Sequence, residues 1–272
     1  MKVIVNGDDL GISMDVNESI EYCHRIGVLT SASVIANGDD FAGAVEVIRR
    51  NPRLGVGVHL NLDSFRPLSR GTSSIIDPGT GGFFPASVVR SKVQHFRVRV
   101  EDLVREYSAQ IERVNGSGIV ATHLDHHQHL HLYWPVLRAM IEVARTYGIR
   151  CIRSQRLLVT ENKSLSKRVY RAVHQTYLKS RRETPDGYTE FICKDFGAMY
   201  RKIAVLVTRR YRVVEIMTHP SRSNPAEVSF LTDARVIELL SNTELVSFAG
   251  VRDALVNRRH VCGRLEADRH MR

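Results

Sequence analysis

Long apolar runs are missing from this 272-residue sequence, which contains no stretch of 18 apolar residues and therefore no candidate membrane span. The first residues reach Asp8 without an apolar signal region, so we expect a cytoplasmic protein. Cysteine is sparse, and Cys23, Cys151, Cys193 and Cys262 form no C-x-x-C pair. That spacing favours reduced thiols over a disulfide framework.

Aromatic residues are also few, at 7%, but 43% hydrophobic and 25% charged residues are typical of a globular protein. The net charge of +10 raises the question of nucleic acid or an anionic surface as a partner. Acidic residues are absent from Lys163 to Arg182, where seven basic residues alternate with apolar ones at helical spacing. We interpret this segment as a solvated basic helix and expect no specific nucleic-acid partner.

Strand-like runs rich in β-branched residues alternate with amphipathic patterns, which predicts a parallel sheet covered by helices. Helices are predicted after Ser13, over about 98–114 and over 134–143, and Gly27 is placed to end the first in a left-handed conformation. We expect one domain over residues 1–255 and a basic tail over 256–272. The predicted strands are Val3–Val5, Leu29–Ala36, Val56–Leu62, Ile119–Leu124, Cys151–Arg153, Glu190–Cys193, Val213–Met217 and Leu245–Phe248.

The segment from Ser64 to Pro85 is irregular and rich in glycine and proline. Loops of this length inside a compact domain commonly form the walls of functional sites. We therefore expect it to lie beside the site described next.

Aspartate and histidine residues gather where four predicted strands end, at Asp8 and Asp9, at His59, between His123 and His131, and at His219. Taken singly, an Asp-Asp pair is more often a turn or helix cap, and a lone histidine is more often a core residue. Five histidines between 123 and 131 favour a metal instead. Because the carboxyl ends of parallel strands meet at one edge, we expect these residues to converge.

One carboxylate and two imidazoles suit a divalent ion that keeps open positions for water and substrate. A second carboxylate beside the ligand can accept the proton of an attacking water. Since neighbouring residues on a strand point in different directions, we expect Asp8 and Asp9 to do different jobs. The pattern predicts one divalent metal ion, with Mg and Zn both open.

Four segments in order, VNGDDLGIS, GVGVHLNL, ATHLDHHQHLHLYWP and IMTHP, resemble the YdjC-like carbohydrate deacetylase family, which includes chitooligosaccharide deacetylases and hopanoid-biosynthesis-associated proteins. The resemblance covers residues 2 to about 220 and, more loosely, to about 255. It implies an α/β, TIM-barrel-like (β/α) barrel, seven-stranded and distorted. It also implies a metal-dependent hydrolase that removes an acetyl group from an N-acetylated sugar or glycolipid, and is compatible with a homodimer.

The resemblance further implies roles for individual residues. Asp9, His59 and His127 would be metal ligands, Asp8 the general base and His219 the general acid for the departing amine.

Arg153 matches a recurring arginine of the family, and its fork of donors would hold an acetate or sugar oxygen. Leu10, His126 and Gln128 depart from the family pattern, which leaves open the roles of His123, His126, His129 and His131. Asp125 is a candidate to orient a ligand imidazole.

Two other functions remain open on the same residues. A metal-dependent phosphoesterase would use the same Asp and His set, with Arg153 on the phosphate. A non-catalytic carbohydrate- or nucleic-acid-binding protein would keep the fold without turnover. An assay of acetylated amino sugars against phosphate esters separates the first of these from a deacetylase.

Overall fold

The computed structural model describes residues 1–158, 165–190 and 195–251. Its parallel strands follow the order β5-β4-β3-β2-β1-β7-β6, and β8 pairs with β1 outside this path. The strands are β1 (Lys2–Leu10), β2 (Ser31–Val34), β3 (Gly55–Leu60), β4 (His123–His126), β5 (Cys151–Ile152), β6 (Gly187–Glu190), β7 (Val213–Thr218) and β8 (Glu244–Leu245).

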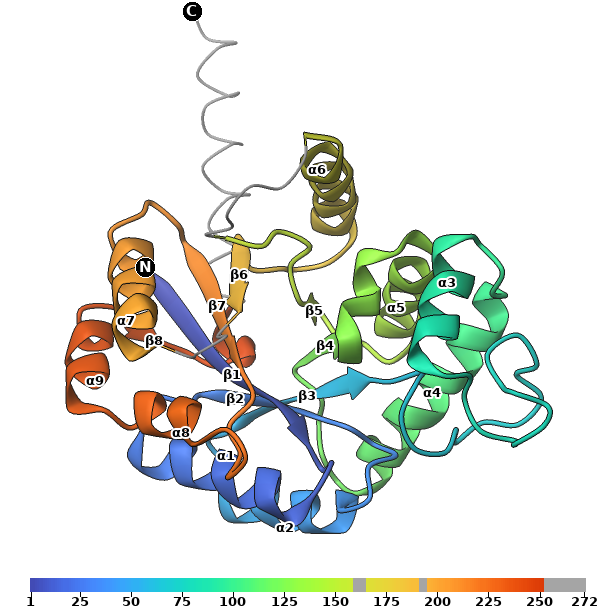
Figure 1. The fold of residues 1–272 in the computed structure, drawn as a ribbon, viewed down its shortest axis with the longest axis horizontal. Helices are drawn as coiled ribbons and strands as arrows, with labels where there is room; N and C mark the ends of the chain where they lie inside the picture. The colour runs from blue at the N-terminus through green and yellow to red at the C-terminus, as the bar shows by residue number, and fades with distance from the viewer. Residues whose placement is uncertain (159–164, 191–194, 252–272) are drawn as a thin grey trace, which may run out of the picture.

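The sheet curls into a half-barrel with helices around its outside (Figure 1). In the described part of the chain, its two ends meet only through isolated bridges, such as Leu157 with Tyr188, so the barrel stays open between β5 and β6. The predicted seven-stranded, distorted TIM-barrel-like fold is confirmed. The helices are α1 (Met14–Ile26), α2 (Phe41–Arg50), α3 (Ala86–Gln94), α4 (Val100–Gly116), α5 (Trp134–Thr146), α6 (Leu165–Arg181), α7 (Phe196–Val207), α8 (Pro225–Leu231) and α9 (Ala234–Ser241).

The first helix shows how local sequence sets these elements. Its N-cap is Ser13, whose hydroxyl accepts a hydrogen bond from the backbone N–H of Val16. Gly27 ends the helix, but the predicted left-handed conformation is wrong, because its φ is −115°. A side chain at Gly27 would place its Cβ 2.4 Å from the carbonyl oxygen of Leu231, so glycine is needed for close backbone packing.

Several predicted boundaries shift. The fourth strand begins at His123, four residues after the predicted start, and β8 keeps only two residues of regular pairing. The predicted strand Glu190–Cys193 lies mostly outside the described residues, and β6 precedes it. The predicted tail over 256–272 lies wholly outside them, so the domain boundary at 255 stays a prediction.

The irregular segment 64–85 is tied to α4 by charged side chains. Glu106 accepts hydrogen bonds from the backbone N–H groups of Leu68 and Ser69, and Asp102 accepts one from Ser74. Its predicted role at the site stays a prediction.

Candidate metal and catalytic site

Asp8 and Asp9 lie near the end of β1, where the pairing with β2 is irregular between Gly7 and Leu10. Asp9 has a positive φ of 69°, a conformation that aspartate tolerates better than most residues. This irregularity turns both carboxylates toward one imidazole, with His59 Nε2 lying 3.9 Å from Asp8 Oδ2 and 3.4 Å from Asp9 Oδ1. Their other contacts differ, because Asp8 binds Arg153 and Asp9 lies 3.1 Å from His127 Nδ1, and the expectation of different jobs stays a prediction.

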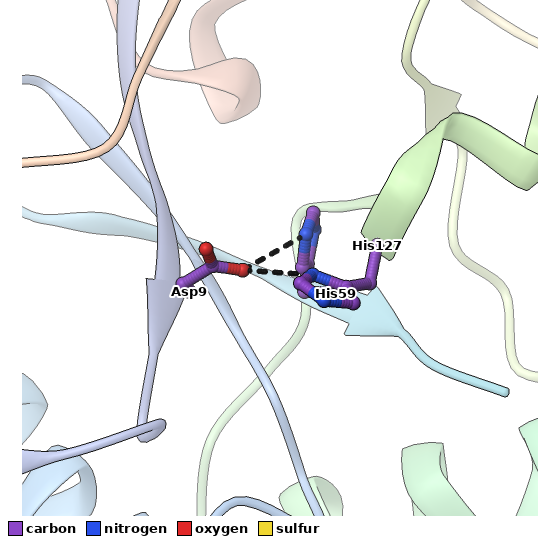
Figure 2. Close-up of side chains that lie close together, drawn as sticks. All are labelled: Asp9, His59 and His127. Carbon is purple, nitrogen blue, oxygen red and sulfur yellow. Dashed lines mark hydrogen bonds and ion pairs between the residues drawn. The ribbon is translucent and has the colours of Figure 1, made fainter. Parts of the chain in front are cut away.

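Three side chains from separate strand ends form a group with metal-ligand geometry (Figure 2). Asp9 Oδ1 lies 3.4 Å from His59 Nε2 and 3.1 Å from His127 Nδ1, and the three ligand atoms lie within 4.8 Å of one another. The Nδ1 atom of His59 lies 2.8 Å from Asp125 Oδ1, which fixes the ring with Nε2 toward Asp9. One carboxylate and two oriented imidazoles fit a divalent ion.

Negative charge exceeds positive charge around this group. Asp8, Asp125 and Glu215 face a single buried guanidinium, that of Arg153, and Asp9 lies beside them against His59 and His127. Burial alone would lower the pKa of His59, but the carboxylates of Asp125 and Asp8 raise it well above its ordinary value. The arrangement favours added positive charge, and a bound divalent cation would supply it.

Arg153 is fully buried and is held by three carboxylates. Its Nη1 and Nη2 atoms donate to Asp8 at 2.7 and 2.6 Å, and Nε donates to Glu215 at 2.8 Å. Nη2 also lies 2.8 Å from Asp125 Oδ2. Burial alone would raise the pKa of Asp8, but Arg153 and His59 lower it, so Asp8 stays ionised. The guanidinium thus fixes the position and charge of Asp8.

His219 also lies close to Asp8. Its Nε2 atom is 3.9 Å from Asp8 Oδ2, and 42% of its side chain is exposed, whereas Asp8 is almost fully buried. Glu227 on α8 accepts a hydrogen bond from the His219 backbone N–H at 2.6 Å, which fixes the turn after β7. The structure therefore brings together all five residues assigned to metal and proton transfer.

His123 and His126 belong to the core. His123 stacks on Phe248 with ring centroids 3.7 Å apart, and its Nε2 lies 3.1 Å from Ser33 Oγ. His126 Nε2 lies 2.9 Å from the hydroxyl of Tyr107. Burial lowers the pKa of each histidine to about 3, so both are neutral.

Glu215, Ser33 and Asn6 were not identified from the sequence. Asn6 Nδ2 donates to Asp8 Oδ1 at 2.7 Å, and Ser33 Oγ donates to Asp125 Oδ2 at 2.7 Å. Glu215 carried a usable signal, because a carboxylate inside the apolar strand Val213–Thr218 must be buried and paired. Ser33 and Asn6 carried no such signal in the sequence.

A second group of polar side chains lies toward the open seam between β5 and β6, and we call it the seam cluster. In the described part of the chain these side chains have buried atoms without a protein hydrogen-bond partner, including both ring nitrogens of His131 and the hydroxyl of Tyr188. The histidine and tyrosine rings lie 5.7 to 6.4 Å apart. The cluster consists of His129, His131, Gln155, Tyr188 and Thr189.

Comparison with known proteins identifies the family. The family model described as YdjC-like protein matches residues 2–244. This chain belongs to the YdjC-like family. One relative of this YdjC-like chain is named carbohydrate deacetylase and comes from Brevibacillus brevis. It is 33% identical over 81% of this chain and 82% of the relative. Another, named carbohydrate deacetylase 1, comes from Listeria innocua and is 30% identical over 93% of this chain and 96% of the relative.

A solved structure supports the fold of this YdjC-like protein. A candidate cellobiose-phosphate cleavage protein from Enterococcus faecalis is 24% identical, with a TM-score of 0.75, over 92% of this chain and 98% of that one.

Proposed function

We propose that this YdjC-like protein is a carbohydrate deacetylase that hydrolyses the acetamide of an N-acetylated sugar or glycolipid with one divalent metal ion. The observation that carries the proposal is the grouping of Asp9, His59 and His127 beside an Asp8 carboxylate held by Arg153. The names of the relatives, carbohydrate deacetylase, support the same reaction.

Asp9, His59 and His127 would hold the metal, with Mg and Zn both compatible with the ligands. When bound, such an ion polarises a carbonyl and lowers the pKa of water. Asp8 is fixed next to this group and ionised, so it accepts the proton of the attacking water. His219, the more exposed partner of Asp8, donates a proton to the departing nitrogen.

Arg153 takes a different role in this proposal from the substrate contact expected above. Its donors face Asp8, Asp125 and Glu215, and the side chain is fully buried. It acts through Asp8 as a positioning residue. The phosphoesterase alternative loses support on the same ground, because it requires Arg153 to reach a phosphate.

The proposal is tested by incubating the purified protein, loaded in turn with Zn, Mg, Mn or Co, with N-acetylated glycans and glycolipids and measuring released acetate. Phosphate esters serve as the competing substrates. Acetate release without phosphate release is expected, and the reverse would overturn the proposal.

Metal content provides the matched test of the ligands. Asp9→Asn and His127→Ala are each expected to lose most of the bound metal, since three ligands are the minimum for an open catalytic site. His95→Ala removes an exposed histidine after α3, and this variant should keep the bound metal. Full occupancy in the His127 variant would refute the ligand assignment.

A further inference from the structure

The outward face of α6 is apolar. Leu165, Val169 and Val173 are 74%, 55% and 59% exposed, and their spacing of four residues places them along one side of the helix. We call these three residues the α6 stripe. A surface helix normally turns polar residues outward, so this stripe is a candidate contact surface.

The opposite side of α6 is already packed. His174 and Leu178 are buried, and the Trp134 ring of α5 lies 5.3 Å from the His174 ring and 4.7 Å from the Tyr177 ring. Figure 1 shows α6 projecting beyond the other helices of the barrel. The α6 stripe thus remains exposed on the side of the helix that does not pack against the barrel.

Positive charge surrounds the stripe. The helix contains Lys167, Arg168, Arg171, Lys179 and Arg181 and no acidic residue. Among residues 1–158, 165–190 and 195–251, no carboxylate forms an ion pair with Arg168 or Arg171, whereas Lys179 lies 3.4 Å from Asp186. This uncompensated charge favours an acidic partner.

A groove of about 620 Å³ runs between α6 and the segment after β5. Its lining mixes two kinds of side chain, which suits a ligand with both an acidic and an apolar part. The basic lining residues include Arg156, Arg168 and Arg171, and the apolar ones include Leu157, Leu165 and Val169.

We propose that α6 binds the surface of a membrane containing anionic phospholipid. The α6 stripe enters the boundary between headgroups and acyl chains, and the basic side chains contact lipid phosphates. This is peripheral binding, because no helix of the described residues is long and apolar enough to cross a membrane.

Two other occupants fit less well. A second copy placed on this face about a two-fold axis would bring the same basic side chains together. A nucleic acid would pair with the arginines but would leave the aliphatic stripe exposed to water.

The test is flotation of the full-length protein with phosphatidylcholine vesicles and with vesicles containing one quarter phosphatidylglycerol. We expect binding to the anionic vesicles to be at least roughly tenfold stronger, and to weaken at 0.5 M salt. Val169→Asp/Val173→Asp and Arg168→Glu/Arg171→Glu should each lower the binding at least roughly tenfold.

Matched controls separate this surface from general effects. Val120→Asp and Arg53→Glu alter an exposed valine and an exposed arginine outside α6 and should bind as the wild type does. Acetate release from soluble sugars should be unchanged in all four variants, so failure here is distinguishable from failure of the proposed function.

Four outcomes would overturn the proposal. Wild-type protein could ignore anionic vesicles, or the α6 variants could bind them normally. Binding of single-stranded RNA, but not vesicles, that is lost in the arginine variant would assign the face to nucleic acid. A dimer in light scattering that Val169→Asp/Val173→Asp dissociates, without vesicle binding, would assign it to a second copy.

Discussion

Two groups of buried polar residues share the interior of this half-barrel, and they differ in how completely they are paired. On the β1–β4 side, Asp8, His59 and Asp125 each have partners within 3 Å. On the other side, His131 and Tyr188 of the seam cluster have ring nitrogens or a hydroxyl without a protein partner in the described residues. Glu215 is paired only in part, since Oε1 accepts a hydrogen bond from Arg153 whereas Oε2 has no partner among the described residues.

The difference in hydrogen bonding between the two groups follows from how the strands of the sheet pair. Continuous pairing from β4 through β1 fixes the backbone on which the first group stands. Tyr188 and Thr189 of the second group lie on β6, which pairs with β7 on one side and borders the open seam on the other. Fully paired buried charges hold one geometry, which a catalytic site requires. We infer that the chemistry takes place at the paired group.

The largest effect should come from Asp8 in the paired group. Asp8→Asn keeps the shape but cannot take up the proton, so the deacetylation rate should fall about 10²–10⁴-fold while metal content is retained. Asp39→Asn, an exposed control, should keep full activity. A variant at position 8 with more than half of the wild-type rate would identify another base, with Asp125 the next candidate.

Removing Arg153 should give the largest loss of stability. Arg153→Met leaves Asp8, Asp125 and Glu215 without their common cation, and breaking a buried pair of this kind costs about 3–5 kcal/mol. Urea unfolding measures the loss, and Arg153→Lys, which keeps the charge without the fork, should lose less. A loss under about 1 kcal/mol for Arg153→Met would show that the pairing contributes little.

Glu215 should make stability depend on pH. Burial raises its pKa to about 7, from an ordinary value of 4.5, although Arg153 lowers it. The folded chain therefore binds this proton more tightly, and the resulting stability is complete below about 4.5 and is lost as pH rises through about 7. Glu215→Gln cannot titrate and so does not lose this stability. Between pH 4.5 and 8 the unfolding free energy of the wild type should therefore fall, relative to that of the variant, by on the order of 3 kcal/mol. Parallel curves for the two proteins would contradict this.

The smallest effects compare two buried tyrosines directly. Tyr107→Phe leaves His126 Nε2 without the hydroxyl 2.9 Å away and should cost about 1–3 kcal/mol. Tyr188→Phe leaves no described protein group unpaired and should change stability by less than about 1 kcal/mol. Equal costs in urea unfolding would remove the distinction between the two groups.

Much of this arrangement was predictable from the sequence. The alternation of strands and helices predicted the parallel half-barrel, because sheet and helix periodicities are local properties. The strand-end positions of Asp8, His59 and His219 predicted their convergence, because parallel strands end at one edge.

Other features were not predictable because they depend on contacts between distant segments. Gly27 is required by a carbonyl of α8, and Arg153 is enclosed by carboxylates from β1, β4 and β7. The positive φ of Asp9, which turns it toward His59 together with Asp8, departs from the alternation that strand periodicity predicts.

The left-handed backbone of Asp9 limits how this position can vary during evolution or in a mutant library. Glycine, asparagine and aspartate are the residues that adopt this conformation readily, and β-branched residues are the least suited to it. Only aspartate among these carries a carboxylate. Saturation mutagenesis of position 9 should therefore give three classes of protein. Aspartate alone should be active, a few variants should fold but be inactive, and most should lose both yield and activity.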